Sequence, residues 1–235
     1  MLELRGIDTF YGDSHVLHGL SLVVAKGECV AVLGKNGVGK TTMVRSIAGL
    51  SKPRNGAIYL DGENLAPLKT YQIIRRGVAL VPQGRRMFSS LTVRETLEIS
   101  AEARRFDSEG RSWTFERVFA AFPRLKERLD TRTGWLSGGE QEMLAVARAL
   151  VGSPRLLLLD EPSEGLSPLV VEQLGEIFTG LKREGATIVM VEQQVAFALK
   201  LADRVLVMSK GAFVYEGTPD ELLGNAEVRE RYLGL

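Results

Sequence analysis

The sequence predicts an α/β fold in which a parallel sheet carries an inserted block of helices. Three observations support this fold class. Short strand patterns fill most of the first 60 residues, residues 84–152 have the spacing of helices, and strands alternate with helices after residue 152. Apolar strands that alternate with helices are typical of a parallel sheet covered on both faces. At 235 residues the chain is within reach of one α/β domain, so we expect a single domain over residues 1–235.

The first 60 residues are predicted to form short strands, because apolar or alternating runs are separated by turn residues. The last run ends at Asp61-Gly62, a dipeptide typical of tight turns. One helix interrupts these strands. It begins near Lys40 and ends near Ala48, where Gly49 supplies a C-terminal cap. The predicted strands cover residues 2–7, 20–24, 28–33 and 57–60.

Residues 84–152 are predicted to form a helical subdomain. The segment is rich in Arg, Glu and Ala, and its apolar residues recur at helical spacing, as Val93 and Leu97 do. Because strands and helices alternate again beyond it, residues 1–83 and 153–235 are expected to form one core together. The expected elements of the second half are a strand over 155–160, a helix over 170–181, a strand over 187–191, a helix over 195–202 and a strand over 205–208.

Composition and charge exclude several classes of protein. The 30 basic and 29 acidic residues leave a net charge of +1, so no overall field attracts nucleic acid, and no nucleic-acid partner is expected. The single cysteine, Cys29, excludes an internal disulfide and fits a reducing compartment. Glu3 and Arg5 stand where a signal peptide needs an apolar stretch. Since no uncharged run approaches the ~18 residues that span a bilayer, membrane association is expected to go through a partner.

A glycine-rich segment, residues 34–41, reads Gly-Lys-Asn-Gly-Val-Gly-Lys-Thr and matches the pattern G-x-x-x-x-G-K-[ST]. An apolar strand precedes it and a helix follows, as the motif requires. Its glycines allow backbone N–H groups to surround phosphates, and the helix N-terminus adds its dipole. Lys40 is expected to reach the β- and γ-phosphates, and the Thr41 hydroxyl to coordinate Mg²⁺. The predicted nucleoside triphosphate site consists of Gly34, Asn36, Gly37, Gly39, Lys40, Thr41 and Thr42.

Two carboxylates, Asp160 and Glu161, follow the apolar strand Leu156–Leu159. The C-terminal ends of parallel strands are where open α/β sheets bind ligands. Asp160 suits the oxygen shell of Mg²⁺, and Glu161 suits a general base that polarises the attacking water. Alone, such a pair would be an ordinary solvated strand end. Together with the glycine-rich segment it predicts the hydrolytic half of the site.

A third motif is the segment Leu136-Ser137-Gly138-Gly139-Glu140-Gln141, called here the signature segment. Ser137 and Glu140 have the spacing of a capping box, so a helix is expected to begin here and continue to Leu150. Two glycines in its first turn would cost roughly 1 kcal/mol each relative to alanine. They make sense if the backbone there approaches another group closely, and a helix N-terminus with these residues predicts an anion site.

With these three motifs in order, the sequence resembles the ATP-binding subunits of ABC transporters over essentially its whole length. It is most similar to the subunits of branched-chain amino-acid importers, with urea or short-chain amide importers as the alternative. The resemblance implies an α/β fold with a P-loop NTPase core and its parallel sheet, an N-terminal antiparallel β subdomain and an inserted α-helical subdomain. The matching segments are residues 33–42, 81–86, 136–150, 160–168 and 191–193.

The resemblance also assigns roles to residues and implies ATP and Mg²⁺ as ligands. Tyr11 matches the aromatic residue that stacks on adenine. Gln83 matches the glutamine that touches Mg²⁺ and the attacking water and links the core to the helical insertion. Ser137, Gly138 and Gly139 match the residues that bind the γ-phosphate of ATP held by a second subunit. Two ATP molecules are therefore expected between two such subunits.

Two positions depart from the usual pattern of the family. Gln193 stands where a histidine usually contacts the γ-phosphate, and Ser167 stands where an aspartate is common. A glutamine still donates a hydrogen bond but carries no charge. Gln193 is therefore retained as a catalytic candidate beside Glu161 and Gln83. Both departures recur among the amino-acid and amide importers, so they favour that branch.

The same resemblance implies partners and a location. These are an integral membrane permease, a solute-binding protein reached indirectly, and a second ATP-binding subunit, with a heterodimer expected and a homodimer as the alternative. The chain is expected to lie peripherally at the cytoplasmic face of a bacterial inner membrane. The segment from Gly84 to Phe106 is expected to contact the permease, because it follows Gln83 and offers Met87, Phe88 and Leu91 among arginines.

Two other functions would also use a phosphate loop. A soluble ABC-type ATPase that acts on nucleic acid or ribosomes resembles tandem modules or carries long coiled-coil insertions, whereas this chain has one module and no heptad run. A small-molecule kinase with the same phosphate loop has no reason to keep the signature segment. The sequence therefore favours a transport ATPase.

Overall fold

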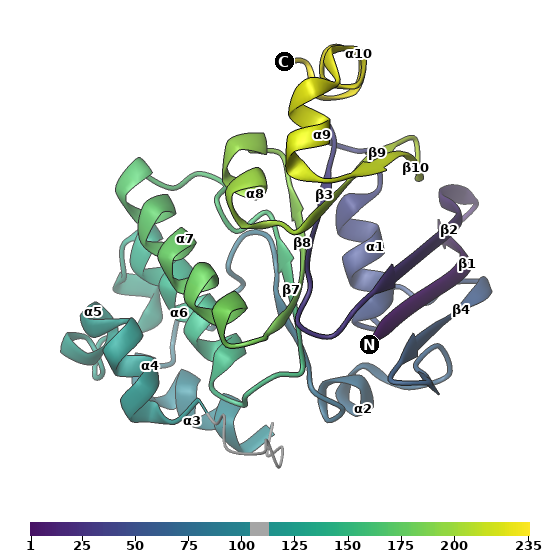
Figure 1. The fold of residues 1–235 in the computed structure, drawn as a ribbon. Helices are drawn as coiled ribbons and strands as arrows, with labels where there is room; N and C mark the ends of the chain where they lie inside the picture. Colours follow the sequence, from purple (N-terminus) through teal and green to yellow (C-terminus); the bar gives the residue numbers. More distant parts are fainter. Residues whose placement is uncertain (104–112) are drawn as a thin grey trace.

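Two β-sheets with helices packed on them make up the computed structural model, which describes residues 1–103 and 113–235 (Figure 1). The smaller sheet has the strand order β2-β1-β4-β5, and every pairing in it is antiparallel. This sheet is the N-terminal antiparallel β subdomain that the resemblance implied. Its strands are β1 (Leu2–Tyr11), β2 (Ser14–Val24), β4 (Asn55–Leu60) and β5 (Glu63–Asn64).

The larger sheet has the strand order β10-β9-β3-β8-β7-β6 and is parallel except at one edge. Among the strands that the structure describes in this sheet, only β9 and β10 pair in antiparallel fashion, so the expected parallel sheet is confirmed with one added edge strand. The sequence patterns missed β6, which is short, and β10, which has no fully buried residue. The strands are β3 (Cys29–Leu33), β6 (Val78–Val81), β7 (Leu156–Asp160), β8 (Thr187–Glu192), β9 (Arg204–Ser209) and β10 (Ala212–Gly217).

Helices of the described residues cover both faces of the larger sheet. They are α1 (Lys40–Ile47), α2 (Thr70–Ile74), α3 (Val93–Ala103), α4 (Phe115–Ala121), α5 (Pro123–Glu127), α6 (Gly138–Leu150), α7 (Pro168–Arg183), α8 (Val195–Leu201), α9 (Pro219–Gly224) and α10 (Ala226–Val228). A 3₁₀ turn lies at Thr133–Trp135 and a π turn at Arg229–Leu233. The division into a core (1–83 and 153–235) and a helical subdomain (84–152) stays a prediction.

The two faces of the larger sheet pack against different layers, because successive side chains of a strand point to opposite sides. Leu156 and Leu158 of β7 share one core cluster with α1 and the smaller sheet. Leu157 and Leu159 share a second cluster with α6 and α7. Figure 1 shows α1 between the two sheets and α6 and α7 on the other side of the larger sheet.

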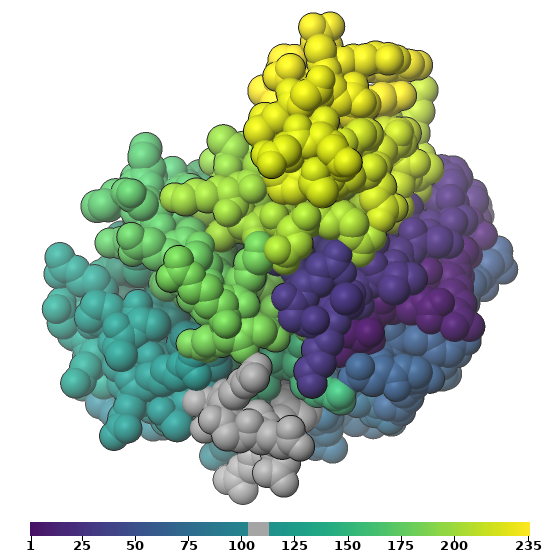
Figure 2. Space-filling model, viewed as in Figure 1, coloured from purple at the N-terminus to yellow at the C-terminus, as the bar shows by residue number. Residues whose placement is uncertain are grey.

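A third cluster fixes the C-terminal segment onto the molecule. Leu222 of α9 is buried against Leu33 of β3 and Val207 of β9, and Tyr232 and Leu233 pack onto the same cluster. Figure 2 shows these last residues, in yellow, as a lobe raised at one end of the molecule.

The fold brings three strand ends together. β3, β8 and β7 are neighbouring parallel strands, so their C-terminal ends lie at the same edge of the sheet. The phosphate loop follows β3, whereas β7 ends at Asp160 and β8 ends at Glu192. This edge is where an open α/β sheet binds ligands.

Candidate functional site

The phosphate loop is the turn between β3 and α1. Gly34 lies in the left-handed region (φ 157°), and a Cβ atom there would lie 2.5 Å from the carbonyl oxygen of Met208. The position therefore accepts only glycine without a shift of the backbone. Helix α1 begins at Lys40 after Gly39, and no side chain among the described residues caps it. Its first-turn N–H groups are thus available to an anion.

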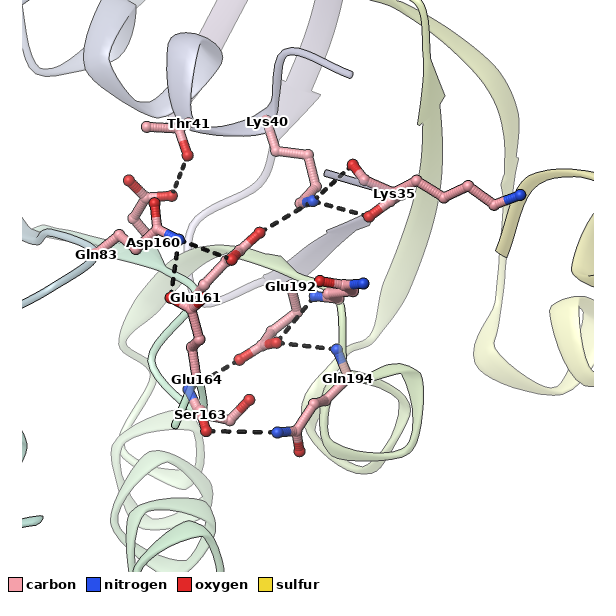
Figure 3. Close-up of polar contacts among 12 residues, drawn as sticks. Lys35, Lys40, Thr41, Gln83, Asp160, Glu161, Ser163, Glu164, Glu192 and Gln194 are labelled. Carbon is pink, nitrogen blue, oxygen red and sulfur yellow. Dashed lines mark hydrogen bonds and ion pairs between the residues drawn. The ribbon is translucent and has the colours of Figure 1, made fainter. Parts of the chain in front are cut away.

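Lys40 reaches back into this loop from the start of α1, and 3% of its surface is exposed. Its Nζ donates to the carbonyl oxygens of Gly34 (2.8 Å) and Lys35 (3.1 Å). The same Nζ lies 3.0 Å from Oε1 of Glu161, and Figure 3 shows all three contacts. The sequence motif placed Lys40 in the loop, and the structure adds Glu161 as its ion-pair partner.

Thr41 and Asp160 form the next contact of the site. The Thr41 hydroxyl donates to Oδ1 of Asp160 at 2.9 Å, which connects the start of α1 to the end of β7 (Figure 3). Burial raises the pKa of the Asp160 carboxyl, and the hydrogen bond from Thr41 opposes that rise. Hydroxyl and carboxylate oxygens are the ligands that a hard cation prefers, so this donor set fits Mg²⁺. The described residues contain no group of three or more His, Cys, Asp or Glu placed to hold a metal.

Glu161 and Gln83 meet at the same edge of the sheet. Nε2 of Gln83 donates to Oε2 of Glu161 at 3.1 Å and to Oε2 of Glu164 at 2.8 Å (Figure 3). Glu161 is 8% exposed and has a left-handed backbone (φ 52°), which is costly for a residue other than glycine. Its carboxylate thus lies between the ammonium of Lys40 and the amide of Gln83. The structure therefore groups the three residues that the sequence analysis assigned separately.

Glu192 is a buried acid to which the sequence analysis assigned no role. Its carboxylate accepts hydrogen bonds from the backbone N–H groups of Ser163 (3.0 Å), Gln193 (3.0 Å) and Gln194 (3.1 Å). Burial raises the pKa of this carboxyl, while the N–H donors lower it. Glu192 thus connects the loop after Glu161 to the loop after β8. A signal existed in the sequence, since β8, like β7, is an apolar strand that ends in an acid.

Gln193 is positioned through its backbone. Val191 pairs with Asp160 across β8 and β7, so Gln193 lies just beyond the strand end that neighbours Glu161. Its backbone N–H binds Glu192, and the residue itself is exposed. Gln193 therefore lies at the same edge of the sheet as Asp160 and Glu161.

Tyr11 ends β1 and is 45% exposed. Its hydroxyl lies 3.1 Å from Oγ of Ser51. It lines a pocket of about 460 Å³ together with Arg45 of α1, Arg86 and Asp160. Tyr11 and Asp160 therefore border one space, although β1 and β7 belong to different sheets.

The signature segment opens α6 as the capping box predicts. The backbone N–H of Ser137 donates to Oε2 of Glu140 (2.8 Å), and the N–H of Glu140 donates to Oγ of Ser137 (3.3 Å). Gly138 and Gly139 form the first turn of the helix. Because α6 and α1 pack on opposite faces of the larger sheet, the chain does not fold its signature helix onto its phosphate-loop helix (Figure 1).

Comparisons with known proteins identify the family of the chain. The sequence model of the ABC transporter family matches residues 17–164, which include both halves of the site and the signature segment. The chain belongs to the ABC transporter family. This membership means that the chain binds ATP and hydrolyses it to energise transport. The sequence predictions of ATP binding and ATPase activity are thus confirmed.

Relatives of full length are found among ABC transporter ATP-binding proteins. The chain is 45% identical over 234 residues to the high-affinity branched-chain amino acid transport ATP-binding protein BraG of Pseudomonas aeruginosa, covering 100% of each chain. It is 34% identical to a probable branched-chain amino acid transport ATP-binding protein, LivF, of Archaeoglobus fulgidus, covering 100% of this chain and 99% of LivF. It is also 30% identical to BraF of P. aeruginosa, again a branched-chain amino acid transport ATP-binding protein, covering 100% of this chain and 98% of BraF.

Solved ABC transporter structures have the same fold. One structure of an ATP-binding subunit has a TM-score of 0.84 and 30% identity, covering 100% of this chain and 96% of that chain. A dimeric ATP-binding cassette bound to ADP and phosphate in a post-hydrolysis state has a TM-score of 0.80 and 25% identity, covering 93% of this chain and 99% of that chain. The α/β fold that the sequence predicted is therefore confirmed as that of ABC ATPases.

Proposed function

We propose that this ABC transporter ATPase energises the uptake of branched-chain or other hydrophobic amino acids. The observation that carries the proposal is the 45% identity to BraG over the full length of both chains. Gln193 in the histidine position and Ser167 in the aspartate position support the same branch of importers. Urea or short-chain amides are the alternative solutes, because the segments around Gln83 and Glu164 resemble both kinds of importer.

In the proposed site, residues of the phosphate loop bind the triphosphate. The exposed N–H groups at the start of α1 and the ammonium of Lys40 face the phosphates. Asn36, Gly37, Gly39 and Thr42 complete the loop, and Tyr11 stacks on adenine. Support for the last role comes from the pocket that Tyr11 and Asp160 both line.

Thr41, Asp160 and Gln83 are the residues that would hold Mg²⁺. The support is the Thr41–Asp160 hydrogen bond and the approach of Gln83 to the same strand end. Proteins usually bind Mg²⁺ through one or two carboxylates together with substrate phosphates. When bound, the ion neutralises charge that develops on the transferred phosphoryl group.

Glu161 is the proposed general base, and Gln83 and Gln193 are the residues that assist it. A general base must lie within hydrogen-bond reach of the attacking water, and Gln83 already contacts Glu161 at 3.1 Å. Gln193 is exposed at the adjacent strand end, where its amide could donate to the γ-phosphate. Two amides and one carboxylate would thus surround the water and the phosphate that it attacks.

The second half of each site is proposed to come from another ATP-binding subunit. Ser137, Gly138 and Gly139 open a helix that packs on the face of the sheet opposite α1. An anion bound at this helix N-terminus would therefore be held by a different subunit's phosphate loop. P. aeruginosa has both BraF and BraG among the ATP-binding proteins for branched-chain amino acids, which favours a heterodimer over a homodimer.

The permease is proposed to dock on residues 84–103, the part of the expected segment 84–106 that the structure describes; residues 104–106 lie outside it. Phe88 is 70% exposed, whereas Met87 packs partly against the core and Leu91 is half-buried. The apolar part of this surface is therefore smaller than the sequence indicated.

Such docking would place the chain peripherally at the cytoplasmic face of the membrane, with the solute-binding protein on the other side. Among the described residues, no helix is both long and apolar enough to cross a bilayer.

Contact with the permease can be tested by cross-linking, with cysteines placed at positions 86 to 92. A cross-link at position 88 is expected, and the absence of any cross-link would contradict the docking surface.

Uptake in cells that lack this subunit tests the proposed solute. Labelled leucine, isoleucine and valine should enter more slowly than in the parent cells, and restoring the gene should restore uptake. Normal uptake of all three with lost urea uptake would replace the first proposal by the alternative. The cells must lack any second importer for the same amino acids, so that a defect is not masked.

A further inference from the structure

The segment directly after Gln83 has an unusual backbone. Gly84, Arg85 and Arg86 all have positive φ, at 75°, 64° and 45°. Glycine adopts this conformation freely, but two consecutive arginines do so at a cost that other contacts must offset. The N–H of Arg86 also donates to the carbonyl of Gly84 at 2.6 Å, which closes a tight turn. Residues held in such a conformation point to a function for the turn.

Helix α6 supplies the contacts that hold this turn. Arg148 donates from Nη2 to the carbonyl of Arg85 and from Nη1 to the carbonyl of Arg86, each at 3.3 Å. Nε of Arg85 donates to Oε2 of Glu142 at 3.3 Å. The Glu142 carboxylate is 7% exposed and the Arg85 side chain is 26% exposed, so the ion pair is largely shielded from water. A shielded pair of this kind is costly to break, because one charge is then left without a partner.

The Arg85 guanidinium also lies against the signature segment. A Cβ atom on Gly138 would lie 3.1 Å from Nη1 and 3.2 Å from Nη2 of Arg85. Gly138 is the first residue of α6, so the guanidinium lies close to the positive end of the helix dipole. The carboxylate of Glu142 on the same helix offsets that unfavourable placement. Arg85 is therefore fixed both to the start and to the second turn of α6.

The other end of the segment contacts the proposed catalytic base. Gln83 donates to Glu161 and to Glu164, as Figure 3 shows. Only Gly84 separates Gln83 from Arg85. One short segment thus contacts the base of this chain's own site and the glycine that would complete the site of another subunit.

We propose that Arg85 is a positioning residue which, through its ion pair with Glu142, fixes the signature glycine Gly138 relative to Gln83 and Glu161. This inference rests on the proposed function, because it assumes that Gly138 as well as Gln83 and Glu161 act in hydrolysis. The connection that Arg85 makes between them is called here the link. When Gln83 moves toward nucleotide, Arg85 moves the start of α6 with it.

The ion pair gives the link a pH dependence. Burial raises the pKa of the Glu142 carboxyl to about 7, although Arg85 and Arg148 both favour its charged form; Glu164 adds to the rise. Glu142 is therefore charged above pH 7 and increasingly neutral below it. The wild-type kcat for ATP hydrolysis should rise with pH through about 7 because the charged pair is then complete.

The test is steady-state ATP hydrolysis by the transporter purified from membranes through a tag on this chain. Arg85→Met should lower kcat about tenfold and leave KM for ATP within about twofold, since no contact of Lys40 changes. Arg85→Lys should retain part of the lost activity. Glu142→Gln should lower kcat to a similar extent and abolish the rise near pH 7. The double variant should be no slower than either single variant, because both remove the same link.

The matched control is Arg124→Met, which removes an exposed ion pair with Glu127 and should change neither kcat nor its pH profile. The proposal is overturned by wild-type kcat in Arg85→Met, by losses that multiply in the double variant, or by a pH rise that persists in Glu142→Gln. A merely structural role of the pair would lower stability without removing that rise. If Arg85→Met does not fold, Arg85→Lys replaces it, with a loss of about threefold expected.

Failure of this inference is distinguishable from failure of the proposed function. If Lys40→Ala and Glu161→Gln are inactive while Arg85→Met and Glu142→Gln behave as the wild type, only the link is wrong. If Lys40→Ala and Glu161→Gln hydrolyse ATP normally, the site itself is wrong.

Discussion

The carboxylate of Glu161 contacts two side chains, one on each oxygen. Lys40 holds one oxygen at 3.0 Å, and Gln83 holds the other at 3.1 Å. Phosphates in the loop would give Lys40 a partner with more charge than one carboxylate. Glu161 would then lose its ion pair and become available to a water molecule. Binding of the triphosphate and activation of the base are thus connected through one side chain.

The charge of Lys40 is the first feature to test. Lys40→Ala removes the buried cation that faces the phosphates, leaving a loop of neutral amides. Affinity for a fluorescent ATP analogue should fall at least about 100-fold. Lys26→Ala, at an exposed position, should bind as the wild type does. Unchanged affinity in Lys40→Ala would contradict the assignment of the phosphate loop.

Substitution of Glu161 should impair ATP hydrolysis but not ATP binding, whereas substitution of Lys40 should impair binding. Glu161→Gln keeps the shape of the side chain but cannot accept the proton, so hydrolysis should fall by about 100-fold or more. ATP should bind at least as tightly as in the wild type, because the amide no longer competes for Lys40. Binding and turnover measured on the same preparation separate the two effects. Turnover near the wild-type rate would mean that another residue is the base.

At the scale of elements, the start of α6 can be predicted from the sequence, whereas its side-chain contacts with residues 84–86 cannot. Ser137 and Glu140 lie three residues apart, so their capping box was readable from the sequence. The contacts of Glu142 and Arg148 with the turn at 84–86 join residues about 60 positions apart. Sequence spacing gives no information on such contacts, because the fold alone brings the two segments together.

The buried Glu142 predicts how stability depends on pH. Its pKa is about 7 in the folded chain against an ordinary value of 4.5, so the folded state binds the proton more tightly than the unfolded state. The resulting stabilisation is fully present below pH 4.5 and is lost as pH rises through about 7. The urea unfolding midpoint of the wild type should therefore fall relative to that of Glu142→Gln as pH rises from 4.5 through about 7.

The matched control for this measurement is Glu127→Gln, at a residue whose side chain is 62% exposed. Its midpoint should follow the wild type at every pH. Parallel curves for wild type and Glu142→Gln between pH 4.5 and 8 would show that Glu142 titrates as an ordinary surface acid.

The sequence predicted strands and helices unevenly, for physical reasons. β3, β7 and β8 are buried on both faces and read as continuous apolar runs, so their positions were predicted within a residue or two. β10 lies at a sheet edge and has no fully buried residue, so no apolar run marks it. Its antiparallel pairing with β9 is decided by the turn at Lys210 and Gly211, which local pattern does not reveal.

At the scale of the whole molecule, some residues of the site can be predicted from local sequence, and others depend on the assembled fold. Lys40, Thr41, Asp160 and Glu161 belong to contiguous motifs, and the sequence alone indicated their types of partner. Glu192 and the contact of Lys40 with Glu161 depend on the order of β3, β8 and β7 in the sheet. The position of the signature segment on the opposite face from α1 is likewise a property of the assembled fold, and it motivates the proposal of a second subunit.

The central claim is that ATP hydrolysis by this chain drives the uptake of branched-chain amino acids. The most direct measurement is labelled leucine uptake in cells that lack the subunit and carry either the wild-type gene or Glu161→Gln, at matched protein abundance and matched association with the membrane. The account predicts uptake restored by the wild-type gene and absent with Glu161→Gln, although that variant still binds ATP and still joins the transporter. Equal leucine uptake with the two genes, or none with the wild-type gene, would contradict it.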